Sequence, residues 1–280
     1  MADSGSDAAL DAPRGPVIDA PAGTAIDAPD ASPMVDAPSG GTALPLLLTE
    51  VVLAPSAGEF IEIANPGSSP VDLSSYYLTD AGGYFRLPGG PPTLEAGDFI
   101  VRFPATAMIP AKGVITIALD TAASFTTAYG AAPTYSLASG TMTMVVTNGV
   151  ASLTNGGELI ALVRWDGTSD LVRDVDIVIA GAPTVANGLV DKSGITLDGP
   201  DSDTTATAYK TDARTVAAQA TAPASGRSTK RTALETGYET QTGAGNGLTG
   251  DDETSENTAM TWDTTFTLPT PGTVPTGLLP

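Results

Sequence analysis

Hydrophobic and polar positions alternate along much of the chain with the two-residue period of β-strands. Ile61 and Ile63 fall on one face of such a segment, while Glu62 falls on the other. The preceding run, residues 46–53, is almost continuously apolar, which is typical of a strand buried more deeply or on both faces. We therefore predict two neighbouring strands, of which the first is the more deeply buried.

A turn follows the second of these strands at Asn65-Pro66-Gly67. Proline presets the backbone for the second position of a turn, and glycine accepts positive φ at the third, so a type II turn is predicted. Alternation resumes in residues 71–79, which predict a third, half-buried strand.

The same alternation predicts more strands along the rest of the chain. They fall at residues 98–103, 114–119, 141–146, 151–153, 158–165, 171–179 and 259–268. The dipeptides Asn148-Gly149 and Asp166-Gly167 favour hairpin turns between them. Residues 121–129 are consistent with a short helix or an irregular segment. Strands at this spacing, separated by turn signals, predict a sandwich or a barrel.

The segment from residue 46 to residue 80 resembles the lamin-tail domain of bacterial surface and secreted proteins. The resemblance rests on an apolar strand ending at Glu50, then EFIEI at 59–63, Asn65-Pro66-Gly67, and VDLSSYYLTD at 71–80. Tyr76 stands where that family usually has tryptophan. Weaker similarity continues to about residue 275, in residues 103–104, 109–115, 153–162, 228–231 and 269–272. The resemblance implies an all-β, immunoglobulin-like β-sandwich in a family without a single known activity.

A low-complexity region precedes the predicted strands. The triplet Asp-Ala-Pro recurs there with starts at Asp11, Asp19, Asp27 and Asp36. Frequent proline, small side chains and like charge leave too little apolar surface to offset the entropy of ordering. We therefore predict a disordered acidic tether over residues 1–43 and a sandwich over 44–275, with an insertion at about 181–226 and a tail at 276–280.

Composition excludes several classes of function. The chain has 12 basic and 32 acidic residues, for a formal net charge of −20, which opposes binding to nucleic acid because phosphate contacts require basic patches. It contains neither cysteine nor histidine, so disulfides, thiol nucleophiles, zinc fingers and histidine-based triads are excluded. No run approaches the ~20 apolar residues that cross a bilayer.

The candidate metal ligands are Asp198, Asp201 and Asp203, because clustered carboxylates in a loop can bind calcium. An EF-hand does not fit, since Ala206 and Asp212 stand where that loop needs glycine and glutamate. A solvated acidic loop with turn-forming aspartates explains the same pattern. A second acidic cluster comprises Asp251, Asp252, Glu253 and Glu256, and the same alternative applies to it.

Other groups of side chains have structural interpretations. Asp174 and Asp176 fall on one face of a predicted strand, as at a solvent-facing edge, although two carboxylates are also what a glycosidase needs. We expect the basic group Arg227, Lys230 and Arg231 to pair with nearby carboxylates or C-terminal loops. The remaining candidates are aromatic, and we expect packing rather than carbohydrate stacking for them: Tyr76, Tyr77, Tyr84, Trp165 and Trp262.

These observations predict a non-enzymatic cell-surface or secreted module for adhesion, scaffolding or ligand presentation, with no cofactor and with an unidentified protein or glycan partner at the cell envelope. The alternatives are a calcium-binding or carbohydrate-binding accessory domain and a carboxylate-dependent hydrolase. The first residues lack the basic and apolar regions of a signal peptide. The protein is then either cytosolic or exported by a signal upstream of Met1. The predicted tether and the resemblance to surface proteins favour export, with a lipid anchor upstream.

Overall fold

The computed structural model of the chain describes residues 45–181, 190–211, 222–234 and 245–279. All of them lie in one compact unit, Thr42–Pro280. The predicted tether, residues 1–43, lies outside the described residues.

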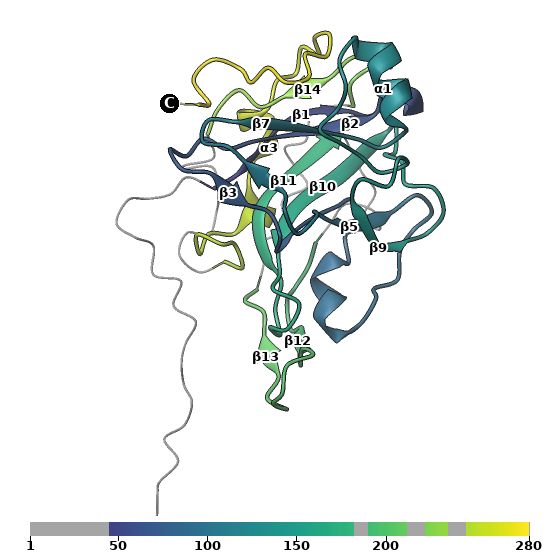
Figure 1. The fold of residues 1–280 in the computed structure, drawn as a ribbon. Helices are drawn as coiled ribbons and strands as arrows, with labels where there is room; N and C mark the ends of the chain where they lie inside the picture. Colours follow the sequence, from purple (N-terminus) through teal and green to yellow (C-terminus); the bar gives the residue numbers. More distant parts are fainter. Residues whose placement is uncertain (1–44, 182–189, 212–221, 235–244, 280) are drawn as a thin grey trace, which may run out of the picture. The chain divides into compact units, whose positions relative to one another are not determined.

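Two five-stranded sheets form the body of this unit (Figure 1). The first sheet has the order β14-β1-β2-β7-β8, and its pairs are antiparallel except for β7 with β8. Its strands are β1 (Leu47–Val52), β2 (Phe60–Ala64), β7 (Val114–Ala118), β8 (Tyr135–Ser136) and β14 (Thr229–Lys230). All residues of β1 and β2 are buried, which explains the dense apolar run in the sequence.

The second sheet is antiparallel throughout, with the order β11-β10-β4-β5-β9. Its strands are β4 (Tyr76–Thr79), β5 (Phe99–Arg102), β9 (Thr143–Thr147), β10 (Gly157–Arg164) and β11 (Arg173–Gly181). The predicted hairpin around Asp166-Gly167 joins β10 to β11, and Gly167 has a φ of 89° that favours glycine.

Short elements complete the described fold. Two small two-stranded sheets pair β3 (Val71–Asp72) with β6 (Met108–Ile109) and β12 (Thr196–Leu197) with β13 (Thr207–Ala208). The helices are α1 (Ala122–Tyr129), α3 (Thr258–Thr261) and the 3-10 turns η1 (Ser56–Gly58), η2 (Tyr84–Gly89) and η3 (Glu253–Ser255). None of these described helices is long and apolar enough to cross a membrane.

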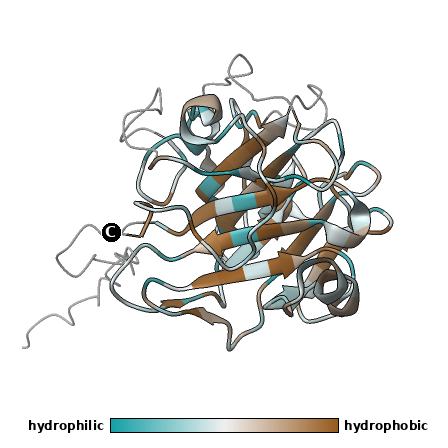
Figure 2. Ribbon diagram, turned by 90° about the horizontal axis from the view of Figure 1, so that it is seen from above, coloured by the Kyte–Doolittle hydropathy of each residue, from teal (hydrophilic) through white to brown (hydrophobic). Residues whose placement is uncertain are grey.

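The main hydrophobic core contains inward-facing residues of both sheets, among them Leu48, Ile61, Leu78 and Ile160. Apolar residues dominate the strands, although hydrophilic positions interrupt them (Figure 2). The predicted all-β, immunoglobulin-like β-sandwich is therefore confirmed. Hydrophobic clusters also form on two outer faces: Phe125 of α1 packs on the first sheet, and Tyr209 packs with η2 on the second.

Three local predictions are wrong. The predicted strand 71–79 is divided between β3 and β4 by a turn in which the Tyr76 N–H donates to the Leu73 carbonyl. Gly67 does not have positive φ; instead its N–H donates to the Asn65 side chain at 2.9 Å, so side-chain hydrogen bonding replaces the type II turn. Residues 151–153 form no strand, because β9 pairs with β5 and the Leu153 N–H donates to the Glu59 carboxylate.

The predicted last strand, residues 259–268, is also wrong. The segment begins as α3, where the Trp262 N–H donates to the Thr258 carbonyl, and then continues as a loop. Among the described residues, an isolated antiparallel bridge joins Trp262 to Arg231 just after β14, and the Asp263 N–H donates to the Lys230 carbonyl. The alternation of Met260, Trp262 and Phe266 therefore reflected packing of Trp262, not a strand.

Candidate functional site

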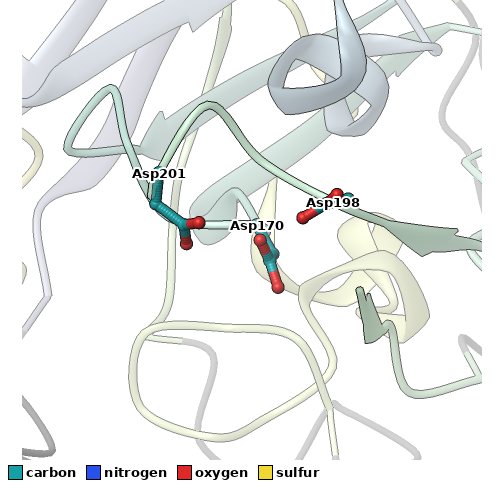
Figure 3. A group of neighbouring side chains, drawn as sticks. All are labelled: Asp170, Asp198 and Asp201. Atoms are coloured by element: carbon teal, nitrogen blue, oxygen red, sulfur yellow. The ribbon is translucent and has the colours of Figure 1, made fainter. Parts of the chain in front are cut away.

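Asp198 and Asp201, two of the three predicted metal ligands, lie close to Asp170, which follows the β10–β11 turn (Figure 3). One carboxylate oxygen from each of these three residues lies within 4.8 Å of the others. Asp203 is not in this group; its carboxylate accepts from the Thr205 N–H and its own N–H donates to Asp201. Sequence reasoning missed Asp170, because this residue is 28 positions from Asp198 and only the fold brings the two loops together.

Hydrogen bonds within the protein already occupy Asp170. Its carboxylate accepts from the Gly199 N–H at 2.7 Å and from the Thr207 hydroxyl, so it ties the β12–β13 hairpin to the β10–β11 turn. The Thr207 hydroxyl and then the Gly199 N–H lower the pKa of Asp170. Oxygen ligands of this kind suit calcium, but exposed turn-forming aspartates have the same arrangement. The calcium site stays a prediction, with Asp170 in place of Asp203.

The second predicted acidic cluster does not bring three carboxylates together in the described part of the chain. Asp252, Glu253 and Glu256 are buried instead. Asp252 accepts from the Thr254 N–H at the start of η3, and Glu256 lies 3.5 Å from Arg231. The cluster therefore serves the packing of the C-terminal segment.

Arg231 is the centre of a buried ion network. Its guanidinium lies 2.6 Å from Asp176 and 3.5 Å from Glu256, its Nε donates to the Leu48 carbonyl, and its Cζ lies 5.2 Å from the centre of the Trp262 ring. Lys230 lies 3.5 Å from Glu50 and donates to the Leu268 carbonyl. The expected pairing with carboxylates and C-terminal loops is therefore confirmed for these two residues, whereas Arg227 is exposed.

The prediction that Asp174 and Asp176 form a solvent-facing edge is wrong, because both residues are fully buried. A β-bulge at Leu162/Val163 pairs Leu162 with Asp176 and Val163 with Asp174, which breaks the two-residue alternation and separates the two carboxylates. Asp176 binds Arg231 between the sheets, while Asp174 binds Lys192 and the Tyr84 hydroxyl on the outer side of the second sheet. A glycosidase pair on one strand face is therefore ruled out for these residues.

The sequence analysis did not identify the glutamates within the apolar strands of the first sheet as candidate functional residues. Glu50 accepts from the Thr270 N–H, and Glu62 accepts from the Gly272 N–H, so both hold the C-terminal segment on the sheet. Burial raises the pKa of Glu62 to about 7 and also raises the pKa of Glu50. The available signal was a charged residue inside an otherwise apolar strand.

Strand β9 is the most exposed of the long strands, and it ends the second sheet beyond β5 (Figure 1). Met144 and Val145 are 39% and 41% exposed, and Val150 in the following loop is 84% exposed. Residues 121–157 contain no charged side chain, although the whole chain has a net charge of −20. The sequence does contain a signal for this uncharged, apolar sheet edge, namely the long segment without charged residues.

The aromatic candidates pack as expected. Tyr76, Tyr77, Tyr84 and Trp262 are buried. Trp165 is partly buried, lies 6.1 Å from Tyr77 between ring centres, and donates its indole N–H to the Ser169 carbonyl. These rings therefore do not form an exposed stacking surface for a sugar.

The two packed sheets, with ion pairs such as Arg231–Asp176 buried between them, define an immunoglobulin-like domain of the structural or binding class. Residues 41–169 match the family described as Lamin Tail Domain, so this part of the chain is similar to a lamin tail domain. No curated protein and no solved structure showed a significant match. The family match ends before β11 and β14, both of which belong to the sandwich.

Proposed function

We propose that the protein is a non-enzymatic binding module that acts at the cell surface or after secretion, and that it recognises its partner by strand addition at the edge of β9. The observation that carries this proposal is the exposed, uncharged edge of the second sheet. Backbone N–H and C=O groups on an open edge give affinity, and the side chains beside them give specificity.

The chemistry of this edge defines the partner. Because no charge lies within residues 121–157, the edge gives a basic strand no carboxylate to pair with. An uncharged, β-branched segment fits best, since such residues pair well with the threonine, valine and methionine side chains of β9. A bulge in the β5–β9 pairing between Ile100 and Val101 interrupts the edge, so the added strand pairs with the part on either side of Val145.

The fate of the charged residues supports a non-enzymatic role. Asp174, Asp176, Lys192 and Arg231 are buried in ion pairs that join segments of the fold. A pocket beside β7 is lined by Val114, Phe125, Thr134 and other uncharged residues, so it offers no acid or base for hydrolysis.

Binding of a synthetic, fluorescent peptide of alternating threonine and valine tests strand addition. We expect saturable binding to the full chain and a loss of roughly tenfold or more in affinity for Val145→Lys, because this substitution puts a charge that the apolar peptide cannot pair beside the added strand. Met260→Lys is the matched control, since Met260 is 56% exposed in α3. Equal affinity in the Val145 and Met260 variants, or no binding to the wild type, would rule out this edge.

Display outside the cytoplasm rests on the predicted tether and on the resemblance to surface and secreted proteins. The tether would place the sandwich away from an anchored upstream end. Antibody labelling of intact cells tests it: we expect labelling without permeabilisation, and labelling only after permeabilisation would contradict it.

Calcium binding by Asp170, Asp198 and Asp201 is the second candidate, because the fold assembles these three carboxylates from two loops. A ligand that binds the folded state raises the melting temperature, Tm. If this group binds calcium, the increase in Tm will be lost in Asp170→Asn. An unchanged increase in that variant would exclude this group as the source.

A further inference from the structure

Two acidic side chains project into the sandwich at the same end of adjacent strands. Asp80 directly follows β4, and Glu158 is the second residue of β10. The β4–β10 register pairs Thr79 with Ala161, while Leu78 and Ile160 both belong to the main core. By strand alternation, Asp80 and Glu158 therefore project from the same inner face as those core residues, as diagonal neighbours.

Each of the two carboxyl groups has one oxygen that is held and one that is not. Asp80 Oδ1 accepts from the Phe99 N–H at 2.7 Å, and Glu158 Oε2 accepts from the Thr154 N–H at 2.9 Å. Asp80 Oδ2 and Glu158 Oε1 are buried and have no hydrogen-bond partner among the described residues. The residues are only 1% and 2% exposed. Buried polar atoms in native proteins are generally satisfied, so these two oxygens require a partner.

The electrostatics show what kind of partner is needed. Burial, and then the charges of Glu158 and Asp98, raise the pKa of Asp80 well above its usual range. Burial raises the pKa of Glu158 to about 7, and the charge of Asp98 contributes. The charged side chains that act on the pair are thus acidic, and a compact positive charge would offset both the burial and the repulsion.

We propose that Asp80 Oδ2 and Glu158 Oε1 bind a hard divalent cation, of which calcium is the best candidate, and that this ion ties the end of β4 to the start of β10. Carboxylate oxygens are the ligands that calcium prefers. The two proposed ligand atoms are both carboxylate oxygens, whereas a softer metal prefers nitrogen or sulfur ligands. Asp98, at the start of β5, adds a third negative charge near the pair. This site goes beyond the binding function proposed above.

The proposed site differs from the Asp170 group in both position and burial. Asp198 and Asp201 are exposed and lie in the loop after β12, whereas Asp80 and Glu158 lie inside the sandwich. Variants of one group therefore leave the other unchanged, and a calcium titration can assign binding to either.

The experiment measures Tm of the full chain in calcium-free buffer at pH 8, above the pKa of about 7 of Glu158, and again with added calcium chloride. For the wild type we expect Tm to rise by roughly 5–10 °C at about 100 times the Kd. Asp80→Asn and Glu158→Gln should lose most of this increase, while the double variant Asp170→Asn/Asp201→Asn should keep it. Sodium chloride at the same ionic strength controls for ionic strength.

A second measurement keeps the proposal falsifiable if Asp80→Asn or Glu158→Gln does not fold. Equilibrium dialysis counts the calcium bound to the Asp170/Asp201 double variant, in which the proposed site is intact, and we expect about one ion per chain. No bound calcium in that variant, no change in Tm of the wild type, or a full increase in Tm for Glu158→Gln would each overturn the proposal. In those cases a proton, rather than a metal ion, neutralises the pair.

Discussion

Arg231 shows how single buried residues hold distant parts of this chain together. Its guanidinium bonds Asp176 in β11, the Leu48 carbonyl in β1 and Glu256 after η3. Period-two alternation assigns charged residues in strands to a solvent face, so it could not predict a charge inside the sandwich. The carboxylates that bind Arg231 lie 55 and 25 positions away in the sequence, and only long-range packing brings them together.

Replacement of Arg231 by alanine should destabilise the fold strongly. Removing one partner of a buried ion pair leaves an uncompensated charge, which typically costs about 3–5 kcal/mol. Urea denaturation measures the loss in the free energy of unfolding. Arg227→Ala, at an exposed position four residues earlier, should change this free energy by no more than about 0.5 kcal/mol. Similar values for the two variants would contradict the assigned network.

Buried carboxyl groups should make the calcium-free protein more stable in mild acid than at pH 8. Burial raises the pKa of both Glu62 and Glu158 to about 7 from an ordinary value of 4.5. Between these values the folded state binds protons that the unfolded state has released, so the free energy of unfolding falls as pH rises from about 4.5 to about 7. The stabilisation is complete below the unfolded pKa and is lost above the folded one.

Denaturation at a series of pH values measures this fall in the free energy of unfolding, which should amount to about a few kcal/mol for each group. Glu62→Gln/Glu158→Gln should show a smaller fall over the same range, because it lacks the contribution of these two groups. A wild-type stability that rises from pH 5 to pH 8 would show that these carboxyl groups are not buried as described.

At the scale of elements, local pattern predicted well where turn chemistry and burial agreed. The β10–β11 hairpin follows from Asp166-Gly167 between two alternating runs, and β1 and β2 follow from their apolar residues. Alternation failed where pairing depends on distant segments: residues 259–268 alternate, yet Trp262 packs against Arg231 instead of joining a sheet. The sequence analysis missed Asp170 for the same reason, since the spacing of residues within one loop cannot reveal a ligand from another loop.

The edge strand β9 illustrates what the sequence does and does not contain. Its alternation and its lack of charge are visible in residues 141–147, but its position at the end of the sheet is not. Edge strands are often protected by charged residues or proline, and the stretch from 134 to 157 contains neither. The bulge opposite Ile100/Val101 is the one protective feature that the structure describes on this strand.

At the scale of the whole molecule, the sandwich extends beyond the segment that defines the family. Residues 41–169 match the lamin tail domain, but β11 and β14 lie on the outer edges of the two sheets. Further along, the N–H groups of Thr270 and Gly272 donate to Glu50 and Glu62 in the first two strands. The C-terminal part of the chain is therefore integral to the domain, and some of its acidic residues, among them Asp176 and Glu256, are buried inside it.

The central claim is that a partner strand adds to the open edge of β9. Hydrogen–deuterium exchange with and without the threonine–valine peptide tests it most directly, because strand addition protects backbone amides of the edge that receives it. We predict slower exchange on peptide binding in residues 143–147, with little change in β14 at the far edge of the other sheet. Binding accompanied by protection elsewhere, with β9 unchanged, would contradict the account.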